Sequence, residues 1–292
     1  MQSSFKSILL SKVSIILYFT MPIIIYASEL AIATRHNHYQ NVTDYIVKLW
    51  RRYFPRDYEN HMKLFQEKND IEVVEETPEE YLRKLAKSSN VDISKCLNSK
   101  DVGTLNVEKK KIVETIISKT KNIDPKEILK LKECVERVTN TNFGTKHEVN
   151  SLKKYNSKTK KQIETTQKFF KKPFIKTSKF EWYLGGKIDG LDTEEDKIIE
   201  FKNRVNRLFY KLRDYEKVQT MTYMFLLDKK QSNLVENLKT KGENKMNVIE
   251  VGWDQKFWND EVIEKTKVFI NNFEKFIEST EQKLNLLEEL CD

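Results

Sequence analysis

The chain has 292 residues, of which 39% are hydrophobic and 33% are charged, and it contains only 7 glycines and 5 prolines. This composition excludes a disordered chain and disfavours a β-sandwich, so we expect a helix-rich α+β protein large enough to bury a core. The 52 basic and 44 acidic residues give a formal net charge of +8, which favours a polyanionic partner such as nucleic acid or an anionic membrane.

The N-terminus is apolar and is preceded by basic residues. Lys6 and Lys12 precede an apolar run that extends over residues 13–27, a pattern typical of a signal peptide. A secreted or membrane-anchored protein is therefore one interpretation. The interpretation that we favour is that Met21 is the working start and residues 1–20 form an upstream extension. On that basis we expect an intracellular protein without stable membrane association, with secretion as the alternative.

The next part of the chain is predicted to be mainly helical. Apolar residues between 42 and 50 have helical spacing, and residues 55–140 are polar and rich in lysine and glutamate. Asp124, Pro125 and Glu127 have the pattern of a helix N-cap, a first-turn proline and a capping box. We expect residues 21–292 to form one domain in which residues 55–140 are a helical insertion.

After residue 143 the pattern alternates between helices and strands. Apolar residues recur with a period near 3.6 in some segments and with a period of 2 in others. The predicted helices span residues 143–154, 215–227 and 259–289, and the predicted strands span residues 180–186, 197–202 and 247–251.

Two acidic residues flank a turn in this region. If the turn centres near Glu194 and Glu195, antiparallel pairing places Asp189 directly opposite Glu200, with about 4.5–5.5 Å between their Cβ atoms. Two carboxylates at this distance repel each other unless one is protonated or a cation lies between them. A hard divalent cation with oxygen ligands fits this position, so Mg²⁺ is the expected cofactor and Mn²⁺ is an alternative.

Lys202 follows Glu200 by two residues, and the alternation of a strand places both on one face. A lysine beside an activated water can orient that water or help to remove its proton. Ile199 and Phe201 are expected to point to the opposite face, into the core. The Glu-x-Lys triplet alone carries little information, because residues 243–245 match it too. The alternative is a solvated hairpin with a surface salt bridge.

Three further residues are candidates for the same centre. Glu148 lies near the start of the predicted helix 143–154 and is a candidate third acid; the alternative is an exposed carboxylate that interacts with the helix dipole. Gln219 and Tyr223 are four residues apart on one predicted helix, so they share a face. Gln219 is a candidate to hydrogen-bond substrate or water, and an ordinary surface glutamine is the alternative.

Taken together and in order, these motifs resemble the lambda-exonuclease/YqaJ branch, of viral recombinase type, of the PD-(D/E)XK nuclease superfamily. The resemblance covers residues 27–54 and about 143–275. The blocks that carry it are residues 27–31 with 37–39, residues 144–148, residues 186–190 with 199–202, and residues 215–223.

The resemblance implies a restriction-endonuclease-like core, with a mixed central sheet flanked by helices. It also implies roles for particular residues. Lys202 would position the attacking water, and Gln219 would support the site. The implied metal ligands are Glu148, Asp189, Glu200 and the backbone carbonyl of Phe201, and the implied DNA contacts are Ser28, near a 5′ phosphate, and Tyr223.

The expected function is that of a metal-dependent DNA exonuclease that hydrolyses phosphodiester bonds at duplex ends in recombination or repair. Arg204 and Arg207 are candidates to hold the DNA backbone, and a solvated basic loop is the alternative. An endonuclease on the same core and a non-catalytic DNA- or protein-binding module are the competing functions. The resemblance also admits a homo-oligomer, a single-strand annealing partner protein and, for a viral protein, the cytoplasm or nucleus of a host cell.

Overall fold

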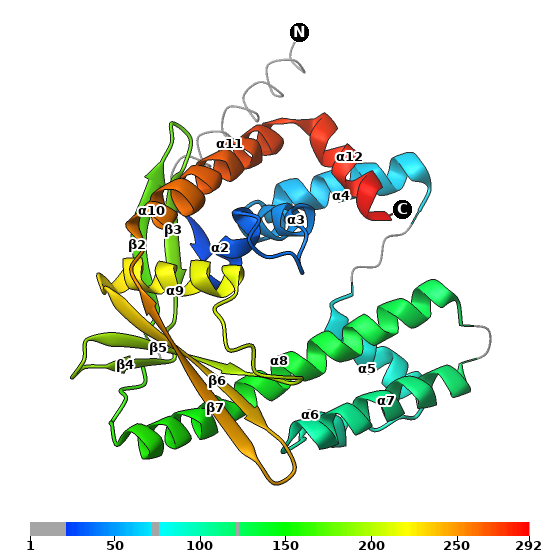
Figure 1. Ribbon diagram of the computed structural model, residues 1–292. Coiled ribbons are helices and arrows are strands. Elements are labelled where there is room, and N and C mark those ends of the chain that lie inside the picture. Colours follow the sequence, from blue (N-terminus) through cyan, green and yellow to red (C-terminus); the bar gives the residue numbers. More distant parts are fainter. Residues whose placement is uncertain (1–21, 72–75, 121–122, 167, 292) are drawn as a thin grey trace.

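The computed structural model describes residues 22–71, 76–120, 123–166 and 168–291, and Figure 1 shows their arrangement. The extension predicted for residues 1–20 lies outside the described residues. The described chain combines helices with two mixed β-sheets, which agrees with the predicted α+β class. Within these residues, none of the helices combines the length and the apolar surface needed to traverse a lipid bilayer.

The first sheet has three strands in the order β1-β3-β2. Strand β1 (Ile23–Tyr26) pairs in parallel with β3 (Glu181–Gly186), and β2 (Phe170–Lys176) pairs with β3 in the antiparallel direction. Ile23 and Ile25 are buried, whereas their neighbours in β1 are half-buried. Strand β1 is therefore part of the folded core.

The second sheet has four strands in the order β4-β5-β6-β7. Its strands are β4 (Gly190–Asp192), β5 (Lys197–Asn203), β6 (Gln231–Lys239) and β7 (Asn244–Gly252). Strands β5 and β6 are parallel, and the other pairs are antiparallel. Where the sequence predicts one central sheet, the structure contains two. The hairpin partner of β5 is the short β4, because β3 belongs to the other sheet.

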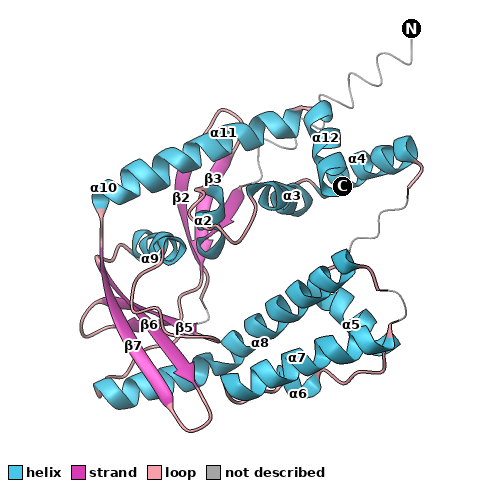
Figure 2. Cartoon of the chain, turned by 45° about the vertical axis from the view of Figure 1, so that its right-hand side comes forward, coloured by secondary structure: helices cyan, strands magenta, loops and turns pink. Residues whose placement is uncertain are grey.

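Strand β5 is buried on both faces, and Ile199 and Phe201 point into a core as the sequence predicts. Ile198 belongs to the main core, and Ile199 belongs to a smaller cluster on the opposite face. Phe201 joins that smaller cluster and packs edge-on against the ring of Tyr155. The reason is tertiary: β5 lies between β4 and β6, and helices cover both sides of this part of the sheet (Figure 2).

The main core lies between the three-stranded sheet and a set of helices. Figure 2 shows α2, α3 and α11 on the same side of the molecule as this sheet. The predicted helix 259–289 is a series of shorter helical segments, with a break at Ser279, which is extended. These segments are a π-helical turn (Trp258–Ile263), α11 (Glu264–Glu278) and α12 (Thr280–Cys291), and the short α10 (Gln255–Phe257) precedes them. The other helices near this core are α2 (Ala27–Ala33), α3 (Val42–Tyr53) and α9 (Asp214–Leu227).

A single helix of 35 residues, α8 (Pro125–Thr159), crosses the molecule. It begins as the sequence predicts, since the Asp124 side chain accepts the Lys126 N–H at 2.8 Å and Glu127 accepts the Asp124 N–H at 3.4 Å. The separate helix predicted over residues 143–154 is the second half of α8. Glu148 therefore lies far from any helix N-terminus, and the helix-dipole explanation for it is wrong.

A helical module with its own core follows the first helices. It consists of α5 (Pro78–Ser88), α6 (Ser94–Leu97), α7 (Val102–Lys119) and the first half of α8, and its core includes Leu82, Leu105, Ile112, Ile116 and Leu131. Figure 1 shows it beside the sheets. By contrast, α4 (Pro55–Asn69) contributes Tyr58 and Phe65 to the main core. The separate core thus begins at α5 and not at residue 55.

Candidate active site

The β4–β5 hairpin holds the two acids in the predicted register. Gly190 pairs with Ile199, so the same register extended by one residue places Asp189 opposite Glu200. The Asp189 carboxylate also accepts the N–H of Phe201 at 2.8 Å, which fixes its position relative to β5. The local pairing that the sequence predicts is therefore present, although the partner strand is shorter than expected.

Two glycines on either side of Asp189, Gly186 and Gly190, allow other parts of the chain to pack closely there. A Cβ atom at Gly190 would lie 2.4 Å from Cγ2 of Ile163, closer than real contacts allow. A Cβ atom at Gly186 would lie 2.9 Å from Cε1 of Tyr223 and 3.2 Å from Cβ of Ala27. The absence of a side chain at Gly186 thus lets α2 and α9 approach the end of β3, and its absence at Gly190 lets Ile163 pack against the hairpin.

Lys202 and Gln219 complete a hydrogen-bonded group around Glu200. The Lys202 ammonium donates to Oε1 of Glu200 at 2.9 Å and to Oε1 of Gln219 at 2.8 Å. Nε2 of Gln219 in turn donates to Oε1 of Glu200 at 3.0 Å. We call Asp189, Glu200, Lys202 and Gln219 the acid–lysine centre. Strand alternation places Lys202 beside Glu200, and α9 adds Gln219 from a distant part of the sequence.

The ionisation of the centre is shifted by burial and by charge. Burial raises the pKa of Glu200 to about 8; Lys202 opposes this shift and Asp189 adds to it. Burial also raises the pKa of Asp189, against the effect of the Phe201 N–H. The pKa of Lys202 is raised because its attraction to the carboxylates outweighs burial. At neutral pH the lysine is therefore an ammonium, and Glu200 is mostly protonated.

One oxygen of the centre suits a cation. In the described part of the chain, Oε2 of Glu200 is among the few buried side-chain atoms that have no hydrogen-bond partner. Such atoms are rare in proteins, and they often mark the place where an ion binds. Two adjacent carboxylates form a donor set of the type that Mg²⁺ and Mn²⁺ prefer. The residues present thus fit a hard divalent cation.

Glu148 lies close to this pair but does not join it. Asn203 of β5 donates to the carbonyl of Gly144 at 2.9 Å and accepts from the Ser151 hydroxyl at 2.6 Å. Gly144, Glu148 and Ser151 share one face of α8, so Glu148 faces β5. Burial and the nearby Asp189 raise the pKa of Glu148. Nevertheless, no three His, Cys, Asp or Glu side chains of the described residues converge as a metal cage.

Ser28 and Arg207 are both exposed, as their predicted DNA contacts require. Ser28 lies in the first turn of α2, next to Ala27. Ala27 packs against Gly186 at the end of β3, three residues before Asp189, so Ser28 lies near the acidic hairpin. Its neighbour Glu29 points inward, and its carboxylate accepts from Arg52 at 2.8 and 3.0 Å.

Arg204 is a correction, because its side chain is not available to DNA. Only 9% of the residue is exposed. Its Nε donates to Oε1 of Glu236 at 2.8 Å, and its Nη1 lies 2.7 Å from Oε1 of Glu216. We call Arg204, Glu216 and Glu236 the arginine bridge. It connects the end of β5 with α9 and β6, so the Arg204 side chain is held between two glutamates and is mostly buried.

Glu236 is a buried acid of β6 with donors on both of its carboxylate oxygens. It also accepts the N–H groups of Phe209 and Tyr210, at 3.1 and 3.0 Å, and Nδ2 of Asn247 at 3.1 Å. These donors and Arg204 outweigh burial and lower the pKa of Glu236. No sequence pattern marks this residue, because its partners come from three separate segments.

Tyr223 is the second correction. Its ring is buried against Gly186, and its hydroxyl accepts Nε2 of Gln219 at 3.1 Å. Burial raises its pKa well above the ordinary tyrosine value. Tyr223 therefore supports Gln219 from inside the protein and does not face a DNA strand.

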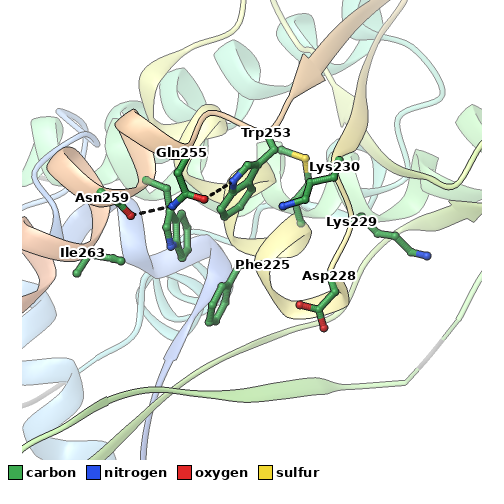
Figure 3. Close-up of a pocket in the computed structure, with 10 residues that line it drawn as sticks. Phe225, Asp228, Lys229, Lys230, Trp253, Gln255, Asn259 and Ile263 are labelled. Atoms are coloured by element: carbon green, nitrogen blue, oxygen red, sulfur yellow. Dashed lines mark hydrogen bonds between the residues drawn. The ribbon is translucent and has the colours of Figure 1, made fainter.

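A separate aromatic pocket lies at the other end of α9 (Figure 3). Its volume is about 270 Å³, and its lining includes Phe225, Trp253 and Trp258. The polar groups along one side pair with each other: Trp253 Nε1 donates to Gln255 at 3.0 Å, and Gln255 donates to Asn259 at 2.8 Å. The only acid among its lining residues is Asp228, so the acid–lysine centre remains the candidate for chemistry.

Comparison with known proteins gives structural similarity only. No protein-family profile and no curated protein matches the sequence. The chain is similar to an alkaline exonuclease from Laribacter hongkongensis, with 15% identity, a TM-score of 0.40, and coverage of 70% of this chain and 93% of the other. It is also similar to a phage-related exonuclease from Haemophilus somnus 129PT, with 11% identity, a TM-score of 0.33, and coverage of 64% and 84%. These values are too low to transfer an activity.

Proposed function

We propose that this chain is a metal-dependent deoxyribonuclease with a restriction-endonuclease-like core, and that it acts as an exonuclease on ends of duplex DNA. One observation carries the proposal. Asp189 and Glu200 are held together beside Lys202 and Gln219, while one buried oxygen of Glu200 has no hydrogen-bond partner among the described residues. A purely structural hairpin has no need for this arrangement, because burying two carboxyl groups next to each other is costly.

The proposed metal ligands are the carboxylates of Asp189 and Glu200, with Glu148 and the carbonyl of Phe201 as further oxygens. When bound there, Mg²⁺ supplies the chemistry that carboxylates lack, since it activates water as a nucleophile and stabilises negative charge on the phosphate. Glu148 faces β5 and reaches the pair through a change of its side-chain conformation. The positive net charge of the chain is consistent with a DNA substrate.

Lys202 has an electrostatic role in this proposal. Because its pKa is raised, it remains an ammonium at neutral pH and cannot take a proton from water. It instead orients the nucleophile and stabilises the charge that develops on the phosphate. Gln219 keeps Lys202 and Glu200 in place, and Tyr223 keeps Gln219 in place.

The test is digestion of linear duplex DNA with Mg²⁺, comparing the wild type with Lys202→Ala and Asp189→Ala. Loss of either group should lower the rate by about 10²–10⁴-fold. Lys245→Ala is the matched control, since Lys245 and Glu243 form the same Glu-x-Lys pair on the surface, 3.3 Å apart. Equal rates in all four proteins would remove the assignment.

A second measurement separates the cation site from catalysis. Titration calorimetry with Mn²⁺ should show binding to the wild type and to Lys202→Ala, but weak or no binding to Asp189→Ala, which lacks a ligand. Incubation with closed circular DNA then distinguishes the two nuclease types, because nicking of the circle identifies an endonuclease and resistance identifies an exonuclease.

A further inference from the structure

The loop between β5 and α9 displays aromatic and basic side chains that the acid–lysine centre does not use. Apart from the buried Arg204, residues 203–213 include three basic residues and no acidic one. Tyr210 in this loop is 67% exposed, and Tyr39, in the connection after α2, is 72% exposed. Among the described residues, these are the two most exposed large hydrophobic side chains. Single exposed aromatics are ordinary, but two beside a basic loop indicate an interaction surface.

Tyr210 has a backbone conformation that is unfavourable for an aromatic residue. Its φ is 55°, in the left-handed region, and no other aromatic residue of the described chain has a positive φ. Glu236 enforces this conformation by accepting the N–H groups of both Phe209 and Tyr210. Strain of this kind persists only where the surrounding structure imposes it, and it is common at functional sites. The Tyr210 side chain in this strained conformation is exposed to solvent.

The rest of the loop is firmly attached, so the exposure of its tip does not result from loose packing. Leu208 is buried in the core of the helical module, and Val205 packs against that core. On the other side, Arg204 joins the loop to Glu216 and Glu236. The helical module therefore supports one side of the loop and the arginine bridge supports the other.

Contacts through Arg213 connect Tyr39 to the ring of Phe209, which precedes Tyr210 in the loop. Nη2 of Arg213 donates to the Tyr39 hydroxyl at 3.0 Å. The guanidinium carbons of Arg213 and Arg207 lie 4.7 and 5.9 Å from the centre of the Phe209 ring. We call Tyr39, Arg207, Phe209, Tyr210 and Arg213 the tyrosine–arginine surface. Its loop starts directly after Lys202 and leads into α9, which carries Gln219.

We propose that the tyrosine–arginine surface binds unpaired nucleotides of a DNA strand, with bases stacked on Tyr210 and Tyr39 and phosphates held by Arg207 and Arg213. Exposed rings stack on any base, and guanidinium groups donate to phosphate oxygens. Paired bases inside a duplex do not offer these faces. The absence of acids between residues 203 and 213 favours a polyanion over an acid-bearing protein partner. This inference rests on the proposed nuclease function and adds a single-strand site to it.

The experiment measures binding in EDTA by fluorescence anisotropy, so that no hydrolysis occurs. The probes are fluorescein-labelled oligo-dT of about 20 nucleotides, an abasic oligonucleotide of the same length, and a duplex of the same length. The wild type should bind oligo-dT more tightly than the abasic probe. Tyr210→Gly should weaken oligo-dT binding about 5- to 100-fold and leave abasic binding nearly unchanged, whereas Tyr210→Phe should bind like the wild type.

Glycine is the informative substitution because it adopts the left-handed conformation freely, so the loop keeps its shape without the ring. Tyr39→Ala should weaken oligo-dT binding in the same direction. Tyr183→Ala is the matched control, since the Tyr183 ring also lies under a lysine, 4.6 Å from the Lys171 ammonium, on the three-stranded sheet. It should leave the binding of oligo-dT unchanged.

The inference fails if Tyr210→Gly binds oligo-dT like the wild type, or if the wild type binds the abasic probe as tightly as oligo-dT. Its outcome is distinguishable from that of the nuclease proposal. A wild type that binds oligo-dT through its bases but hydrolyses no DNA would remove the nuclease function and retain the single-strand site. A wild type that hydrolyses DNA but shows no base-dependent binding would remove only this inference.

Discussion

Two clusters of buried charge lie next to each other along β5 and α9, and they differ in how completely their glutamates are paired. In the acid–lysine centre, Glu200 accepts two hydrogen bonds on one oxygen, and its other oxygen has no partner among the described residues. In the arginine bridge, Glu236 accepts four, from Arg204, Phe209, Tyr210 and Asn247.

The two glutamates consequently ionise in opposite ways. Both are buried, but the pKa of Glu200 is raised to about 8, whereas that of Glu236 is lowered. Burial alone therefore does not decide the charge of a carboxylate; the number of donors around it does. Glu236, which has donors on both oxygens, stabilises the fold, and Glu200 is left able to accept a cation.

The largest effect that this comparison predicts is on the arginine bridge. Glu236→Gln should reduce the free energy of unfolding by about 3–5 kcal/mol, because it leaves buried Arg204 short of one counter-charge. Urea unfolding near pH 7 measures this loss. Because the folded pKa of Glu236 is lowered, its contribution is present at neutral pH and disappears as the pH falls below about 4. A cost that stays constant from pH 7 to pH 3 would contradict the prediction.

The same substitution at Glu200 should have the opposite pH dependence in the metal-free protein. The pKa of Glu200 is about 8 in the folded protein and 4.5, the ordinary glutamate value, in the unfolded chain. Between these two pH values the unfolded chain loses the proton and the folded protein keeps it, so the wild type becomes less stable as the pH rises. Glu200→Gln does not share this loss. Its stability relative to the wild type should therefore rise by on the order of 2 kcal/mol between pH 5 and pH 8.

Urea unfolding in EDTA at several pH values tests this expectation for Glu200. Addition of Mn²⁺ at pH 8 should then stabilise the wild type and not the variant, since the cation binds the ionised carboxylate. If Glu200→Gln becomes less stable relative to the wild type as the pH rises, the two glutamates do not differ in the way that we describe.

A third test moves the acids without changing any charge. Gly190→Ala places a methyl group against Ile163 and should cost about 1–3 kcal/mol of stability through overpacking. It should also weaken Mn²⁺ binding, because the hairpin that holds Asp189 must shift. Gly144→Ala is the control, since nothing lies within 4 Å of its added Cβ and α8 favours alanine by about 0.5–1 kcal/mol. Equal stabilities in both variants would show that the hairpin is not tightly packed.

The smallest effect concerns the strain that the arginine bridge imposes. Tyr210→Gly should stabilise the protein by about 0.5 kcal/mol, because relief from the left-handed conformation exceeds the added freedom of the unfolded chain. Tyr39→Gly should instead destabilise by about 0.5–1 kcal/mol, since no positive φ exists there to relieve. Thermal unfolding of both variants distinguishes these signs, and a loss of stability at Tyr210 would show that its ring packs usefully.

The sequence by itself determined the features that depend on nearby residues. The hairpin register that faces Asp189 with Glu200 follows from the position of the acidic turn, and strand alternation puts Lys202 beside Glu200. The start of α8 follows from its capping residues, and α9 follows from helical periodicity. Each of these is set by interactions over a few residues, which a single sequence contains.

Only the tertiary structure decided which charges are buried and what they contact. Strand β6 carries the buried polar residues Asn233, Glu236 and Asn237 and so lacks the alternation of a half-buried strand. It pairs in parallel with β5 and brings Glu236 to Arg204, whereas Tyr155 of α8 packs on the second face of β5. The environments of Arg204 and Tyr223 depend on the packing of distant segments, which residue spacing does not encode, and this is why the sequence did not predict that both side chains are buried.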